Sequence, residues 1–235
     1  MGTVQQRAPV PGPAFIRQLA RLVHVDLPST SPPLAERLSH WIDWNRAVTL
    51  SRALDGRLAD TGPLVSGAIE AECDACARAR AALVDRITGF RLPEVPGEGA
   101  QSGEAGSGAS IDFAVFRQHV LDMQRAMQTA TGRLRGRLRD LLPSRSAELA
   151  RLAEVDAVME MTLSPREHAL LGRVPAWLEA HFLSLQRAAA SATAPPHDGW
   201  LDTFRRDMQD LLLAELDVRF QPIEGLLAAL RSSSP

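Results

Sequence analysis

The most regular pattern along the chain lies in residues 199–231. Large apolar side chains recur there at steps of three or four, which averages the period of an α-helix and places them on one face. They are Leu201, Phe204, Met208, Leu212, Leu216, Phe220, Ile223, Leu227 and Leu230. Apolar area left in water forgoes roughly 25 cal/mol per Å² of stabilisation, so we expect other helices to cover this face.

The rest of the chain supplies such helices. Apolar residues at helical spacing predict helices near residues 14–25, 32–41, 49–54, 64–90, 113–141, 147–163 and 164–190. No stretch alternates between apolar and polar residues, as a half-buried strand does. The sequence therefore predicts an all-α fold of seven or eight helices that form a helical bundle with coiled-coil-like faces.

Local signals place helix boundaries in the C-terminal half. Ser164, Pro165 and Glu167 match a capping box, in which the Ser and Glu side chains bind free amides at the start of a helix. We therefore expect a helix to begin at Ser164. Pro175 and Pro222 fall within predicted helices, which they are expected to kink or bend.

The composition changes abruptly near the middle of the chain. Residues 92–110 are rich in Gly, Ser, Pro and Glu and nearly free of large apolar groups, which predicts a flexible linker. It separates an N-terminal helical segment, residues 13–91, from a C-terminal helical bundle, residues 111–231. Residues 1–12 are expected to be disordered. Two arrangements fit this division: the halves share one core, or each has its own.

Charge and composition narrow the class of protein. The chain has 235 residues, 45% of them hydrophobic, and a net charge of −2, so it has no bulk attraction to nucleic acid or acidic membranes. Its first residues lack the apolar core of a signal peptide, and no stretch reaches ~18 uninterrupted apolar residues. We therefore expect a soluble, cytoplasmic protein that does not insert directly into membranes.

The pair Cys73 and Cys76 is the first candidate for chemistry. A redox Cys-x-x-Cys needs a helix N-terminus after a strand, and a zinc site needs about two further ligands at matching spacing. Neither context is present, because both residues lie inside a predicted helix on its apolar stripe. Packing is the favoured interpretation, a metal or redox role is the weaker one, and no cofactor is predicted.

Motifs for catalysis are not found. The histidines form neither H-x-x-x-H nor H-E-x-x-H, no G-x-S-x-G occurs, and the Gly-rich stretch lacks the strand and the lysine of a phosphate-binding loop. No catalytic residue can be named. An enzyme is therefore the least supported class.

The best candidate for an interaction surface is the basic run Arg133, Arg135, Arg137 and Arg139. Such a helix could contact a phosphate backbone. Arginines at every second position wrap around a helix, however, and no aromatic residue for base stacking is interleaved with them. Pairing with later acids, within the bundle or across an oligomer, is the favoured interpretation. These acids include Glu154, Glu160, Asp207, Asp210 and Glu215.

Three stretches resemble a known family. They are L-A-E-R-L-S-H-W-I-D-W-N-R-A-V-T-L-S-R-A-L, V-F-R-Q-H-V-L-D-M-Q-R-A-M and F-R-R-D-M-Q-D-L-L-L-A-E-L-D-V-R-F-Q-P-I-E-G-L-L-A-A-L. The family is an uncharacterised proteobacterial one, known from Burkholderia and Xanthomonas relatives as a domain of unknown function. Its genes are often neighbours of genes for stator-like membrane proteins and an OmpA-like protein. The resemblance implies a cytoplasmic accessory of a cell-envelope assembly.

Two functional hypotheses follow. The first is a non-enzymatic helical adaptor or assembly protein that binds other proteins through its helix faces, alone or as a homo-oligomer. The alternative is a nucleic-acid-associated protein that uses the Arg-rich helix at residues 133–139.

Overall fold

A computed structural model describes residues 13–23, 34–55, 67–91, 112–191 and 199–232, and within these ranges the fold is all-α. It contains eight α-helices and no strand, which confirms the predicted class and the number of helices. The helices are α1 Ala14–Val23, α2 Leu34–Trp41, α3 Trp44–Asp55, α4 Gly67–Thr88, α5 Phe113–Leu141, α6 Ala147–Leu171, α7 Val174–Ser191 and α8 Gly199–Ser232. A short 3₁₀ turn, Leu142–Ser144, links α5 to α6.

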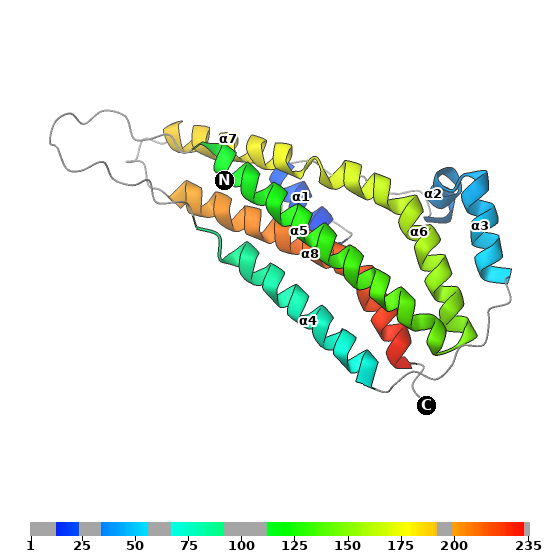
Figure 1. The fold of residues 1–235 in the computed structure, drawn as a ribbon. Coiled ribbons are helices and arrows are strands. Elements are labelled where there is room, and N and C mark those ends of the chain that lie inside the picture. Colours follow the sequence, from blue (N-terminus) through cyan, green and yellow to red (C-terminus); the bar gives the residue numbers. More distant parts are fainter. Residues whose placement is uncertain (1–12, 24–33, 56–66, 92–111, 192–198, 233–235) are drawn as a thin grey trace, which may run out of the picture.

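Helix α8 lies at the centre of the bundle. It packs against α1, α4, α5 and α7, and the long helices α4, α5 and α8 run side by side (Figure 1). All nine apolar residues of the predicted stripe are buried. The helix also runs through Pro222 without ending. The apolar face predicted from the sequence is therefore covered by neighbouring helices, as expected.

A cluster of phenylalanine rings joins three helices. Phe113 and Phe116 come from α5, Phe182 from α7 and Phe204 from α8, and all four are buried. The Phe204 ring packs edge-on against Phe116 at 5.0 Å and against Phe182 at 5.1 Å between centroids. Edge-to-face geometry at this spacing adds about 0.5–1.5 kcal/mol per pair beyond area burial. The cluster fixes how α5, α7 and α8 meet.

Helices from both sides of residues 92–110 contribute to the same core. Phe15 and Leu22 of α1 and Leu83 and Ile87 of α4 belong to one buried cluster with the apolar faces of α5–α8. The predicted disordered start, residues 1–12, and the predicted linker, residues 92–110, lie outside the described residues.

Helices α2 and α3 lie apart from this core, and α3 packs on α6 (Figure 1). Ala53 of α3 is buried, and the guanidinium of Arg166 in α6 stacks over the Trp41 ring at 5.0 Å. Helix α3 begins earlier than predicted because the Asp43 carboxylate accepts a 2.9 Å hydrogen bond from the Arg46 amide, which caps the helix start. The pair therefore forms a small unit on the outer side of α6.

The predicted helix start at Ser164 is wrong. Helix α6 continues through Ser164 and Pro165 to Leu171, and its N-cap is Ser146, whose hydroxyl accepts a 3.1 Å hydrogen bond from the Leu149 amide. Next to the proline, the Arg166 side chain donates to the Thr162 carbonyl at 3.0 Å. Glu167 pairs with Arg219 of α8 and not with its own backbone. Tertiary contacts have thus overridden a local signal.

The helix boundary lies instead at Gly172 and Arg173. Helix α6 ends at Leu171, and Pro175 occupies the first turn of α7, which begins at Val174. The kink predicted at Pro175 is therefore a break between two helices. A proline is well tolerated in a first turn, since the amide it lacks would have no helical partner there.

We expect Ser146→Ala to lower the free energy of unfolding by about 0.5–2 kcal/mol, because it removes the N-cap of α6. Ser164→Ala is the matched control, and as an exposed substitution inside the helix it should change stability by less than about 0.5 kcal/mol. Urea denaturation followed by circular dichroism measures both. A larger loss for Ser164→Ala than for Ser146→Ala would restore the boundary that the sequence suggested.

Candidate functional site

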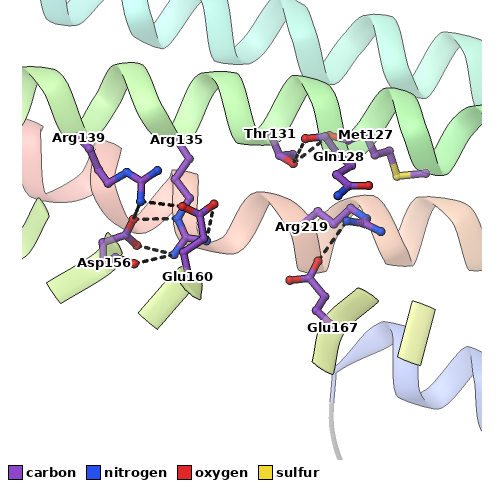
Figure 2. A network of polar contacts seen from close by, with 9 residues as sticks. All are labelled: Met127, Gln128, Thr131, Arg135, Arg139, Asp156, Glu160, Glu167 and Arg219. Carbon is purple, nitrogen blue, oxygen red and sulfur yellow. Dashed lines mark hydrogen bonds and ion pairs between the residues drawn. The ribbon is translucent and has the colours of Figure 1, made fainter. Parts of the chain in front are cut away.

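A layer of ion pairs joins α5 to α6. Arg135 donates from Nε and Nη2 to the Asp156 carboxylate at 2.8 and 2.7 Å, and Arg139 pairs with Glu160 at 2.6 Å. Figure 2 shows both arginines directed at the two acids of α6. Burial lowers the pKa of Arg135, but the hydrogen bond and charge of Asp156 outweigh it and the pKa is raised. Arg135 is therefore held as a cation, and carboxylates of α6 neutralise both arginines.

The four arginines singled out from the sequence do not form one surface. Arg135 and Arg139 face α6, whereas Arg137 pairs with Glu72 of α4 at 2.7 Å. Arg133 is exposed and makes no ion pair within the described ranges. Because these arginines stand at every second position of α5, their side chains leave the helix in different directions and contact different helices.

A second, deeper polar group lies under α6. Glu215 of α8 has no exposed surface, and its carboxylate accepts hydrogen bonds from Arg219 at 2.8 and 2.9 Å and from Gln124 of α5 at 3.0 Å. Arg219 also contacts Glu167 of α6 at 3.2 Å (Figure 2). Burial raises the pKa of Glu215 above its ordinary 4.5, although Arg219 and Gln124 lower it. The pair connects three helices.

The sequence carried a signal for this group. Glu215 follows Leu212 by three residues and precedes Arg219 by four, so it lies on the apolar face of α8 with an arginine one turn away. A buried acid of this kind requires a partner, because an isolated charge in the interior is strongly unfavourable. The position of Gln124 on the facing helix could not be read from the sequence.

Between these two groups lies a polar cleft of about 280 Å³. It is lined by α5, α6 and α8, and an adjoining cleft of about 210 Å³ shares Gln128, His168 and Arg219 with it. Its two arginines, Arg135 and Arg219, are each neutralised by carboxylates. The cleft therefore has no uncompensated cation for an anionic substrate. No group of three or more metal-ligating side chains is found among the described residues.

The two cysteines lie on α4 as free thiols. Burial and the nearby Glu72 raise the pKa of Cys76, which keeps it protonated, whereas a nucleophilic or metal-binding cysteine is a thiolate. The Cys73 sulfur accepts a 3.2 Å hydrogen bond from Arg231 of α8. Both belong to the packing of α4 against α8, with Cys73 only partly buried.

Two histidines are engaged with neighbours. His181 of α7 and Asp207 of α8 form a hydrogen bond of 2.8 Å from Nε2 to Oδ2. His119 stacks on Phe90 at 4.0 Å, and burial together with Arg86 lowers its pKa. Neither shares a cluster with a cysteine or a second histidine.

Among the described residues, the most exposed large apolar side chain lies elsewhere, on α3. Trp44 is 80% exposed and Leu54 is 50% exposed. An open groove of about 470 Å³ lies beside them, formed by Ser39 and Ile42 with Ala47, Leu50, Ser51, Leu54 and Asp55. The small side chains of Ala47 and Ser51 create the hollow. From the sequence alone, the core is the favoured place for any one tryptophan, with an interface as the alternative; the solvent exposure of Trp44 excludes the core.

A comparison with known protein families identifies the family to which the chain belongs. The profile of the family described as "Protein of unknown function (DUF3348)" matches residues 1–232, so the chain belongs to that family. No curated protein matches the chain, and no solved structure does. Among the described helices, none has the length and apolar character needed to cross a membrane.

We expect Arg219→Ala to lower the free energy of unfolding by about 3–5 kcal/mol at pH 7.5, because it leaves Glu215 buried without its cation. The pKa of Glu215, already raised, then rises further. A raised carboxyl pKa contributes stability below its unfolded value of about 4.3 and loses it as pH rises through the folded pKa. The deficit should therefore be smaller at pH 5 than at pH 7.5 in denaturation experiments.

Two variants control this measurement. Arg205→Ala removes an exposed pair with Asp202 and should cost less than about 1 kcal/mol at either pH. Adding Glu215→Gln to Arg219→Ala should recover most of the loss at pH 7.5, since the buried charge is gone. A deficit that is equal at both pH values and is not recovered would show that packing, not charge, determines the effect.

Proposed function

We propose that this member of the DUF3348 family is a non-enzymatic assembly protein that binds protein partners through the outer face of α2 and α3. The observation that carries the proposal is the position of Trp44. It is 80% exposed on a helix pair that contributes nothing to the central core cluster. A pair of helices that the core does not need, and that displays a tryptophan, is best explained as a binding surface.

Physical considerations support this use of α3. Tryptophan, tyrosine and arginine are enriched among residues that dominate binding energy, and a tryptophan buries about 150–250 Å² when it is covered. Leu54, ten residues further along the same helix, and the groove between α2 and α3 add further apolar area to α3. Such a groove suits the apolar side chains of a partner helix.

The polar cleft supports the non-enzymatic part of the proposal. An active site keeps reactive groups available, with pKa values matched to proton transfer. Here the arginines bind carboxylates and the buried Glu215 binds Arg219 and Gln124. These groups stabilise the attachment of α6. Their charges and hydrogen-bonding atoms are engaged with one another, which supports a structural role for them.

The cellular setting we propose is the cytoplasmic side of a cell-envelope assembly. The family resemblance, with its neighbouring genes for stator-like and OmpA-like proteins, supports it. The free thiols of Cys73 and Cys76 are typical of a reducing compartment. The alternative, binding of nucleic acid by α5, rests on exposed Arg133 and half-exposed Arg137.

Affinity purification of the tagged chain from cells of its own species, followed by mass spectrometry, tests the proposal. We expect a small set of protein partners that resists nuclease treatment. Trp44→Ala should reduce their recovery, with affinity falling about 30-fold if Trp44 dominates the interface. Leu183→Ala, which truncates a 46% exposed leucine on α7, is the matched control and should leave recovery unchanged.

Other outcomes point elsewhere. Partners that disappear with nuclease, and that weaken with Arg133→Gln, would establish the nucleic-acid alternative. Partners that are retained by the Trp44 variant and lost with the Leu183 variant would move the binding surface to α7.

A further inference from the structure

The outer face of α3 carries both a protruding residue and a hollow. Trp44 stands 80% exposed at the start of the helix, so its ring does not fill the groove. The helical part of that groove is formed by Ala47, Leu50, Ser51 and Leu54. These residues occupy positions i, i+3, i+4 and i+7 of the helix. In knobs-into-holes packing, four residues at this spacing form the hole that receives one side chain of a partner helix.

We propose that the groove on α3 is filled by Trp44 of a second copy of this chain, so that two copies associate through α3 about a twofold axis. In a twofold interface the same surface serves both partners, and a residue that contacts a second position is contacted by it in return. Helix α3 can meet this condition, because it carries both the protruding Trp44 and an unfilled hole that the Trp44 of a second copy can enter. The inference rests on the proposed function, because it names the partner of that surface.

The register follows from the positions of knob and hole. The hole is centred between Leu50 and Ser51, about two turns beyond Trp44. When two α3 helices run antiparallel, each Trp44 lies over the other hole if the twofold axis passes between Ala47 and Val48. Ala47 then lies at the crossing point. Its small side chain permits the close approach that such packing requires.

Charge does not oppose this association. Residues 34–55 carry three carboxylates, Glu36, Asp43 and Asp55, and three arginines, Arg37, Arg46 and Arg52. The surface is therefore neutral apart from His40, and two copies meet without net repulsion. The contact is centred on the 12-residue helix α3, which is small beside the roughly 20–30 residues a side found in standard interfaces. A reversible dimer of micromolar affinity is expected.

A second copy fits this surface better than an unrelated partner helix. An unrelated helix would need a bulky group at the hole and a cavity for Trp44 at the matching distance. A second copy supplies both from the same residues, and it removes two exposed tryptophans from water at once.

Sedimentation velocity of the full chain, from about 1 to about 200 µM, tests the proposal over the range that brackets micromolar affinity. We expect a concentration-dependent monomer–dimer equilibrium, with a blue shift of tryptophan emission as Trp44 becomes buried. Trp44→Ala removes the knob, and Ser51→Phe fills the hole from the same copy. Each should weaken the dimer by about 30-fold or more. Leu183→Ala on α7 should leave it unchanged.

Mixing the two weakened variants gives the sharpest outcome. The Trp44→Ala copy keeps an open hole and the Ser51→Phe copy keeps its knob, so the mixture can form one of the two contacts. We expect heterodimer in the mixture at concentrations where each variant alone is monomeric. If Ser51→Phe does not fold, as judged by circular dichroism, Ser51→Leu fills the hole from the same exposed position with a smaller side chain.

Two results would overturn the inference. One is a monomer at about 200 µM, well above micromolar affinities; the other is a dimer that Trp44→Ala does not weaken. The proposed function is tested separately from self-association. If Trp44→Ala still reduces recovery of other proteins while the chain is monomeric, the surface binds a different partner, and the assembly role stands without self-association.

Discussion

Burial of the apolar face of α8 is the constraint on which the fold depends. Thirteen residues of this helix are buried, and they reach α1, α4, α5 and α7. No one neighbouring helix could cover a face of that width, so the core requires segments from both ends of the chain. This is why Phe15 and Ile87, far upstream in the sequence, belong to the same cluster as Phe204. The phenylalanine cluster fixes one end of that packing.

The attachment of α6 follows a different principle. On its inner side, Asp156, Glu160 and Glu167 bind arginines of α5 and α8, beside a cleft that apolar side chains do not fill. Only a few apolar residues, including Leu171, join α6 to the core. Ion pairs fix register more strictly than apolar contact does, because a shift of one residue would leave buried charges without partners. The arginines of α5 thus act as structural connectors.

Periodicity was sufficient to predict the number of helices and the buried faces of α5 and α8. The nine-residue stripe of α8 is buried, and Phe116, Val120 and Met123 of α5 face the core as their spacing indicates. The error at Ser164 shows where local rules fail. A capping box is a local preference worth about 1 kcal/mol, whereas Glu167 gains a buried arginine from α8, which no local pattern reveals. Which helix each arginine of α5 would meet depends in the same way on tertiary geometry.

Helix α6 connects the two unusual features of the molecule. Its inner face carries the acids that bind Arg135 and Arg219, and α3 packs on its outer side. Arg166 of the same helix stacks on Trp41 of α2. The place of Trp44 relative to the core is therefore set through α6, by the ion pairs on its inner side. The same ion pairs thereby orient the exposed apolar surface of α3 that the proposed assembly role would use.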